Sequence, residues 1–285
     1  RRDIKKTFSG GDASTYEYLR QSGLSDSFID RLLRPLFAGI FLESKLDTNE
    51  RLFRFIFSSM SRGDMVLPSN GVGAYPNHLA KKIGLERIYL STSAFADDST
   101  TIVIDGQRRT VDQVVVAHPS PSEEKTMKAV WTVYFDSPKS PAPGKFLLLN
   151  GDYELGKTAI AHVAVPSDVQ PSYAPEGRSL VVATIVGDAA DSLNLNNAEA
   201  VESRAREEIR QWFPDCENWR TLDVQHINAA LPSHGAGTDL LFSRPINEDG
   251  IIACGDHMAH ASMQGAINSA EKAANEVIRR IQNRG

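Results

Sequence analysis

The C-terminal segment carries the most constraining feature of the chain, an apolar strand that runs into an acidic turn and then a helix. Gly250-Ile-Ile-Ala-Cys-Gly-Asp-His predicts the strand and turn, and small residues predict a final helix from Gly265 to near Asn283. Gly265 and Ala266 let a ligand approach the backbone closely, and the free amides of a helix start carry partial positive charge. Asp256 can accept hydrogen bonds from the hydroxyls of a ribose or ribityl chain. The segment therefore predicts a site for a polar, electron-rich ring.

Size and composition indicate an ordinary globular protein. With 285 residues, the chain is expected to form one large core or two smaller ones. A formal net charge of −5 argues against a nucleic-acid partner, because binding phosphates requires a basic surface. The 2 cysteines have neither metal-site nor disulfide-framework spacing, which predicts no metal and a reducing, cytoplasmic location. No apolar run is long enough to span a bilayer, and no signal peptide is recognised.

Helical patterns dominate the first part of the chain and return later. Ser14-Thr-Tyr-Glu17 is a capping box, which predicts a helix directly after it. A second helix is expected over 26–34, where Pro35 ends it, and a third over 49–60. The third is apolar on more than one face, so it is expected to be buried on several sides or to line a cavity. A further helix is expected over 198–213.

Strand periodicity takes over in the middle of the chain, so the expected fold class is α/β. Asp105-Gly106 is a hairpin turn signal. The expected strands are 88–90, 101–104, 113–116, 130–135, 146–149, 161–165 and 180–186.

Several blocks in a fixed order resemble the FAD-dependent amine oxidase and phytoene desaturase superfamily, whose C-terminal flavin signature is similar to the Gly255-Asp256 segment. The blocks cover nearly the whole chain, and their order is more specific than any one of them. They are Arg34-Pro-Leu-Phe-Ala-Gly-Ile-Phe-Leu-Glu, Leu46-Asp-Thr, Gly71-Val-Gly-Ala-Tyr-Pro-Asn-His-Leu-Ala, Val114-Val-Val-Ala-His-Pro, Ser172-Tyr-Ala-Pro-Glu-Gly-Arg-Ser-Leu and Ile227-Asn-Ala-Ala-Leu-Pro.

The resemblance implies an FAD cofactor and an oxidoreductase that removes a hydride equivalent from a C–H bond of an apolar or amine substrate. Lys128 resembles the lysine that holds a water near the flavin N5, with an exposed strand-start lysine as the structural alternative. The implied architecture interleaves an α+β substrate domain (1–70 and 120–245) with the C-terminal part of an FAD/NAD(P)-binding Rossmann-like domain (71–119 and 246–285). The implied cofactor-binding residues are Gly255, Asp256, Met263, Gln264, Gly265 and Ala266.

The chain departs from the family at one point, because it contains no strand followed by Gly-x-Gly-x-x-Gly and a helix. The resemblance therefore implies that this part is missing here, and a separate N-terminal Rossmann half is one expected partner. Peripheral contact with a membrane, to collect an apolar substrate, is another.

Two alternatives to the enzyme portion described above remain. The first is a non-catalytic binding or scaffolding module derived from such an enzyme. More remotely, Gly151-Asp-Tyr-Glu-Leu-Gly-Lys-Thr matches the P-loop pattern, with Lys157 as the phosphate-binding lysine of a nucleotide hydrolase. A P-loop must open a helix, whereas 159–165 alternates like a strand and ends at Pro166. The segment is therefore interpreted as a β-hairpin turn.

Overall fold

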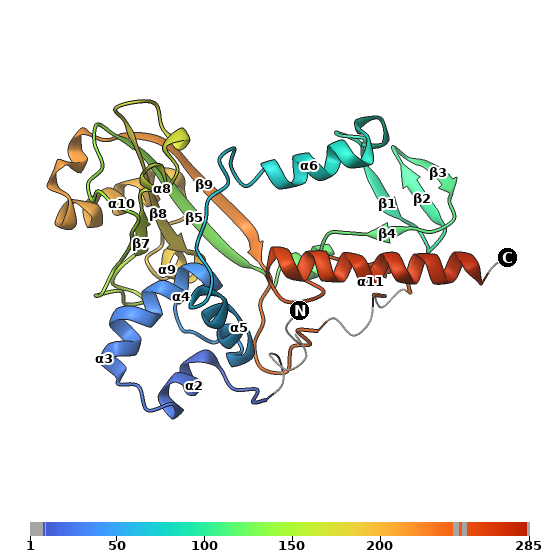
Figure 1. Ribbon diagram of the computed structural model, residues 1–285, viewed down its shortest axis with the longest axis horizontal. Coiled ribbons are helices and arrows are strands. Elements are labelled where there is room, and N and C mark those ends of the chain that lie inside the picture. The colour runs from blue at the N-terminus through green and yellow to red at the C-terminus, as the bar shows by residue number, and fades with distance from the viewer. Residues whose placement is uncertain (1–7, 9, 242–244, 247–249, 284–285) are drawn as a thin grey trace. The chain divides into compact units, whose positions relative to one another are not determined.

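Segments far apart in the sequence come together in two units (Figure 1). The structure is a computed structural model that describes residues 8, 10–241, 245–246 and 250–283. Unit 1 comprises Arg1–Gly10, Pro76–Thr126 and Pro232–Gly285, and unit 2 comprises Gly11–Tyr75 and Met127–Leu231. The chain is 39% helical and 21% strand, which confirms the α/β fold class.

Unit 2 is built on a five-stranded antiparallel sheet with the order β6-β7-β8-β5-β9. Side chains alternate along β5, so Val133 and Phe135 are buried on one face while Thr132 and Tyr134 are half-buried on the other. Four of the strands were expected from the sequence, and the fifth, β9, was not. The strands are β5 (Lys128–Ser137), β6 (Leu147–Leu149), β7 (Ile160–Ala164), β8 (Ser179–Val186) and β9 (Arg220–Leu231).

Helix α10 (Ala198–Trp212) confirms the expected helix before Pro214 and covers the Val133 face of the sheet. Its apolar side packs Val201 and Ile209 into the main core of unit 2. Glu208, on the same helix, is buried and accepts hydrogen bonds from the amides of Ala159 (2.8 Å) and Ile160 (2.9 Å). The carboxylate therefore satisfies backbone donors at the start of β7.

The expected end of the second helix at Pro35 is wrong. Helix α3 (Asp26–Phe28) continues through a π-helical turn, η1 (Ile29–Leu33), into α4 (Arg34–Phe41), which contains Pro35 in its first turn. A proline ring clashes with the carbonyl four residues earlier in a regular helix, and the wider π turn removes that register. Helix α4 then lies against β7, where Gly39 leaves room for the imidazole of His162.

The capping box at Ser14 is confirmed at the start of α2 (Thr15–Gln21), and the third expected helix is confirmed as α5 (Glu50–Met60). Leu52 and Phe53 of α5 are buried, but Phe57 is 46% exposed. In unit 2, α5 is therefore buried along one side only, contrary to the expectation from its apolar composition. The remaining short elements of unit 2 are α8 (Pro166–Val169), η3 (Pro171–Tyr173), α9 (Gly187–Ser192) and η4 (Pro214–Asn218).

Unit 1 contains two small sheets. An antiparallel sheet has the order β1-β2-β3, and its β2–β3 turn at Asp105-Gly106 confirms the expected hairpin. The second sheet pairs β4 with β10 in parallel. The expected strand over 88–90 is wrong, because a 3-10 turn precedes it and the strand forms later, at β1. The elements are α6 (Ala74–Ile83), η2 (Leu85–Arg87), β1 (Ala94–Ala96), β2 (Thr101–Ile104), β3 (Gln107–Thr110), β4 (Val115–Val116), α7 (Pro121–Glu124), β10 (Ile252–Ala253) and α11 (Met263–Gln282).

The P-loop-like segment forms the connection of a β-hairpin. Strands β6 and β7 pair antiparallel on either side of it, and β7 follows where a P-loop would require a helix. Lys157 pairs with Glu154 at 2.8 Å, and both side chains are largely exposed. The interpretation as a turn is confirmed, so the backbone does not form a phosphate cradle here.

Candidate functional site

The carboxyl ends of two parallel strands meet in unit 1. Ile252 and Ala253 of β10 pair with Val115 and Val116 of β4, and the amide of Cys254 donates to the carbonyl of Val116 at 2.9 Å. The segments that follow both strands therefore emerge at the same edge. Open α/β sheets bind ligands outside the carboxyl ends of their strands. Two of the predicted site residues, Gly255 and Asp256, lie at this edge, as does His118.

Helix α11 begins at Met263, two residues before the expected start at Gly265. Ser262 is its N-cap, and the Ser262 hydroxyl accepts a hydrogen bond from the amide of Gly265 at 3.0 Å. That amide is therefore not free, contrary to the expectation. No described residue accepts a hydrogen bond from the amides of Met263 and Gln264, which remain available at the positive end of a 20-residue helix.

Gly265 does not leave open space beside the backbone. A Cβ on Gly265 would overlap the backbone carbonyl oxygen of His260, so the glycine is required by contact with the protein itself. The carbonyl of Ala266 accepts a hydrogen bond from the Ser269 hydroxyl at 2.8 Å. Gly265 therefore has a packing role in the chain itself, and the cofactor role of both residues stays a prediction.

Gly255 has a backbone φ of 139°, a conformation that favours glycine. Its amide donates to the hydroxyl of the buried Ser269 at 2.9 Å, which ties the end of β10 to α11. A Cβ here would overlap the ring of His257, which folds back over the strand end. Asp256 follows with a half-buried side chain, and no described residue donates a hydrogen bond to its carboxylate.

A small electrostatic cluster surrounds this strand end. Burial is the largest influence on the pKa of the His257 imidazole and lowers it, while Glu123 and Asp256 act to raise it. Burial acts to raise the pKa of Glu123, but hydrogen bonds from the amide and hydroxyl of Ser120, together with His257 and His118, hold it below its usual range. The signal available in the sequence was that the segments after two parallel strands carry histidines.

Lys128 lies at the start of β5 in unit 2 and is not an exposed lysine. Its ammonium group donates to the Glu43 carboxylate at 2.5 Å and to the Thr48 hydroxyl at 2.9 Å. The other Glu43 oxygen accepts from the amide of Thr48 at 2.6 Å. The side chains of Lys128 and Glu43 are only 14% and 11% exposed. The structural alternative for Lys128 is therefore wrong, and its catalytic role stays a prediction.

The loop that carries Glu43 is held in an unusual conformation. Leu42 and Leu46 have φ values of 52° and 61°, and positive φ is rare for a leucine. Between them, the amide and hydroxyl of Ser44 both donate to Asp188, at 2.8 and 2.7 Å. The Ser44 hydroxyl also bonds the Tyr153 hydroxyl at 2.6 Å. Buried hydrogen bonds thus compensate for the strained backbone beside Lys128.

A pocket of about 540 Å³ opens next to Lys128, and its walls include the carboxylates of Glu43, Asp47, Asp188 and Asp191. Within the described part of the chain, no group of three or more His, Cys, Asp or Glu residues could hold a metal ion. The pocket therefore presents four carboxylates to a ligand, alongside Lys45 and Lys128.

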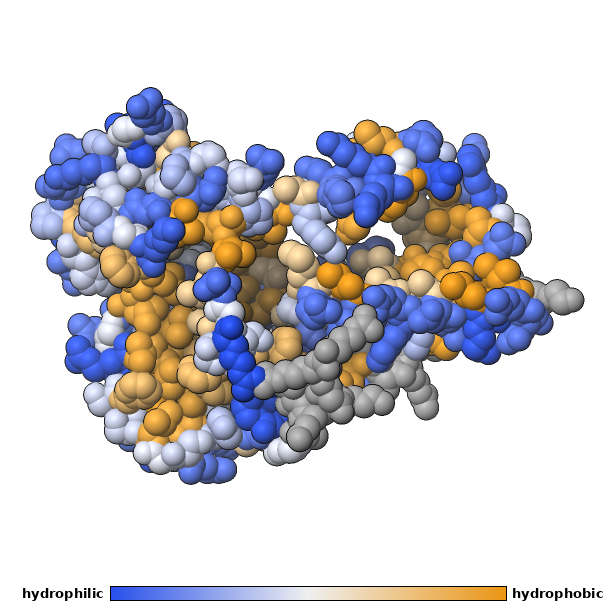
Figure 2. All heavy atoms as spheres, in the orientation of Figure 1, coloured by the Kyte–Doolittle hydropathy of each residue, from blue (hydrophilic) through white to orange (hydrophobic). Residues whose placement is uncertain are grey.

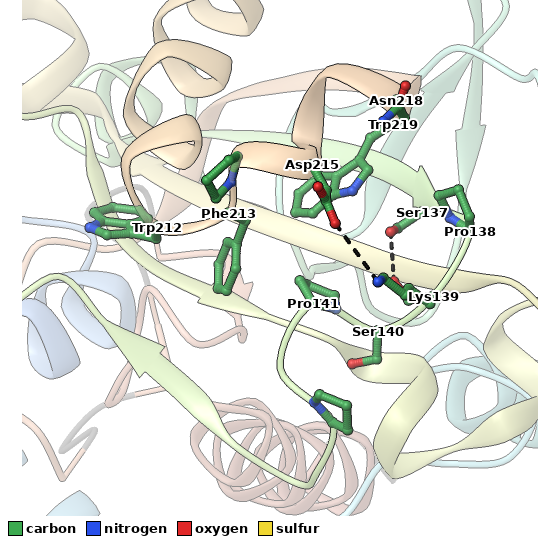
Figure 3. A pocket seen from close by; sticks show the side chains of 12 residues that line it. Ser137, Pro138, Lys139, Ser140, Pro141, Trp212, Phe213, Asp215, Asn218 and Trp219 are labelled. Carbon is green, nitrogen blue, oxygen red and sulfur yellow. Dashed lines mark hydrogen bonds and ion pairs between the residues drawn. The ribbon is translucent and has the colours of Figure 1, made fainter.

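Another cavity of unit 2 lies at the other end of β5 (Figure 3). It measures about 790 Å³ and is formed between the loop after Ser137 and the segment after α10, with Trp212, Phe213 and Trp219 among its walls. Lys139 and Asp215 face each other across it at 3.8 Å. Because β5 rises about 3.3 Å per residue, Ser137 and Lys128 are roughly 30 Å apart. No predicted site residue lines this cavity.

Comparison with known proteins agrees with this architecture. The sequence model of a family described as flavin containing amine oxidoreductase matches residues 1–142 and 133–278. An oxidoreductase from Methanosarcina mazei has a similar structure with a TM-score of 0.72 at 15% identity, over 95% of this chain and 70% of that chain. Cyclohexylamine oxidase from Brevibacterium oxydans has a TM-score of 0.64 at 11% identity, over 97% of this chain and 71% of that chain.

A UDP-galactopyranose mutase also has a TM-score of 0.64, at 12% identity, over 98% of this chain and 70% of that chain. No curated protein matches the chain. At such low identities the likeness to solved structures shows the fold, which both oxidases and a mutase share.

Proposed function

The chain belongs to the flavin containing amine oxidoreductase family, and from this premise we propose that it removes a hydride equivalent from a C–H bond of a small apolar or amine substrate, with FAD as cofactor. It is an oxidoreductase with a flavin cofactor, because its family is described as flavin containing amine oxidoreductase. The identity of the flavin, the substrate class and the site residues belong to the proposal.

One observation carries the proposal: the ends of β4 and β10 and the start of α11 come together in unit 1. The hydrogen bond from Gly255 to Ser269 holds the strand end against the first turns of the helix. The backbone amides of Met263 and Gln264 and the carboxylate of Asp256, which have no hydrogen-bond partner among the described residues, thereby lie at one edge. Their chemistry fits a ligand that combines hydroxyl donors with a group able to carry negative charge, as a flavin does.

In this proposal each residue has a role that its contacts allow. Asp256 would accept hydrogen bonds from the ribityl hydroxyls, and the amides of Met263 and Gln264 would stabilise negative charge on the ring. Bound FAD supplies the acceptor for the hydride equivalent. Lys128 would hold a water beside the reacting atoms, with its ammonium group oriented by Glu43 and Thr48.

Two substrate classes remain, and different residues favour each. The partly exposed Phe57, which stacks on Phe53 at 5.5 Å, favours an apolar substrate. The carboxylates around Lys128 favour a protonated amine instead. An apolar substrate would also favour contact with a membrane surface. Among the described residues, no helix is both long and apolar enough to cross a membrane.

We also propose that a dinucleotide-binding unit with a Gly-x-Gly-x-x-Gly turn completes the flavin site. Parallel strands are normally buried in larger sheets, yet β4 and β10 pair over two residues only. Unit 1 also exposes many large apolar side chains, and Figure 2 shows hydrophobic surface along α11. The exposed large apolar side chains on the helices and strands of unit 1 are Leu79, Ile83, Leu85, Phe95, Val115, Met263, Ile278 and Ile281.

The alternative, a non-catalytic module, is favoured by the contacts of Gly255 and Gly265, because histidines of the chain already fill the space beside both. The same experiment separates the two functions. We would record the visible absorption spectrum of the purified chain before and after adding FAD, for the wild type and for Asp256→Asn. Glu86→Gln, an exposed carboxylate in the same unit, is the matched control.

The enzyme predicts a flavin band that survives desalting in the wild type and in Glu86→Gln but is weakened in Asp256→Asn. A protein that stays colourless with added FAD, both alone and with a dinucleotide-binding unit supplied in trans, would favour the module. A dinucleotide-binding unit supplied in trans should restore the band if the partner proposal is correct.

A further inference from the structure

His257 has the most informative geometry among the residues to which the proposed function gives no role. Its ring lies over Gly255, in the space that any other residue at that position would fill. The Cε1 and Nδ1 atoms lie nearest to the position that a Cβ on Gly255 would take, whereas Nε2 lies farther out, 3.6 Å from that position. A glycine with φ of 139° therefore places an imidazole at the edge where β4 and β10 end.

The ring nitrogens of His257 have no hydrogen-bond partner among the described residues, although the side chain is only half-exposed. Three titratable groups surround it, each from a different segment: His118 after β4, Glu123 on α7 and Asp256 beside it. The two carboxylates favour the imidazolium, while burial and His118 oppose it. These opposing influences leave the charge of the ring sensitive to a further neighbour.

An anionic ligand at this edge would be such a neighbour. A phosphoryl oxygen or a negatively charged flavin within hydrogen-bond distance of Nε2 stabilises the imidazolium and raises its pKa. The proton comes from solvent, and no bond of the ligand is broken. By linkage, a ligand that favours the protonated histidine binds more tightly as the pH falls.

We propose that His257 takes up a proton when FAD binds at the ends of β4 and β10, and that its Nε2–H then donates to an anionic oxygen of the cofactor. The inference rests on the proposed function and deepens it by assigning a recognition residue. His257 is a binding residue for the cofactor, and Gly255 is the positioning residue that gives its ring room.

The test is a set of FAD titrations of the full chain between pH 5.5 and 8, followed by quenching of flavin fluorescence. The variants are wild type, His257→Gln and, as a matched control, His78→Gln, an exposed histidine of α6 in the same unit. We expect the Kd of wild type and His78→Gln to rise with pH, by up to about tenfold per pH unit. The Kd of His257→Gln should be weaker at low pH and nearly independent of pH.

Each other outcome overturns the inference. An equal pH dependence in wild type and His257→Gln would show that another group takes up the proton. If His257→Gln lowers the affinity for FAD by the same factor at every pH, His257 binds the cofactor as a neutral donor and takes up no proton. Either result leaves the proposed function intact, because FAD still binds. If folded wild type binds no FAD at any pH, even with a dinucleotide-binding unit supplied in trans, the proposed function fails and the inference with it.

Discussion

The backbone carbonyl of His260 occupies the space that a Cβ on Gly265 would need, so packing within the protein itself requires a glycine at the start of α11. Gly255 is in a related position, because the imidazole of His257 fills the space beside it. The two glycines differ in one respect that can be measured. The obstacle at Gly265 is backbone, which cannot move away, whereas the obstacle at Gly255 is a side chain.

We expect Gly265→Ala to destabilise the chain by about 1–3 kcal/mol through overpacking, and Gly255→Ala by a similar amount through steric overlap and its positive φ. Adding His257→Ala should recover part of the loss in Gly255→Ala. Adding His260→Ala should recover none of the loss in Gly265→Ala, because the carbonyl oxygen remains. Urea unfolding of the single and double variants measures both couplings. If the losses in the free energy of unfolding from Gly255→Ala and His257→Ala simply added in the double variant, the role of the His257 ring would be contradicted.

The P-loop-like sequence gives a second prediction. Lys157→Ala should change the free energy of unfolding by less than about 0.5 kcal/mol, because its pair with Glu154 is exposed. The variant and the wild type should both lack ATP turnover, since β7 follows the loop and no helix amides converge on a phosphate. Measured ATP hydrolysis that disappears in Lys157→Ala would contradict this interpretation.

Local signals in the sequence predicted most of the strands and the first helix cap, and contacts between distant residues decided the rest. The capping box at Ser14 and the hairpin at Asp105-Gly106 depend on neighbouring residues, so pattern alone was sufficient. The passage of a helix through Pro35 depends on a π turn and on packing against His162, which no short pattern records. In the candidate site, the strand and turn were predictable. The filling of the two glycine positions was not, because it depends on how the loop between them folds back.

His162 makes the stability of unit 2 depend on pH. Burial beside Gly39 lowers the pKa of the imidazole below 6.5, although a hydrogen bond to the backbone of Pro35 acts to raise it, and Nδ1 has no partner among the described residues. As the pH falls below about 6.5, the unfolded chain binds the proton first, so the free energy of unfolding decreases. The decrease ends once the pH has passed the lowered pKa of the folded state.

The expected slope from this one residue is at most about 1.4 kcal/mol per pH unit. Urea unfolding at pH 7.5, 6.5 and 5.5 measures it. His162→Gln should flatten the slope, because an amide does not titrate, whereas the exposed His78→Gln should leave it unchanged. Equal slopes in all three proteins would show that the buried imidazole does not contribute.

The Lys128–Glu43 pair allows stability and activity to be separated. Removing one partner of a shielded ion pair leaves the other charge uncompensated, so Lys128→Met and Glu43→Gln should each destabilise the chain by about 2–3 kcal/mol. The double variant should lose less than the sum of the two, because neither charge is then left alone. Urea unfolding of the three variants measures the coupling.

The proposed catalytic role of Lys128 predicts a different order of kcat values among the same variants. If Lys128 holds a water at the reacting atoms, kcat should fall in Lys128→Met and in the double variant by roughly 10²-fold or more, with FAD affinity unchanged. Glu43→Gln should retain more activity, because the ammonium group can still bond to Thr48. A double variant that regains both stability and turnover would show that the lysine serves only to neutralise Glu43.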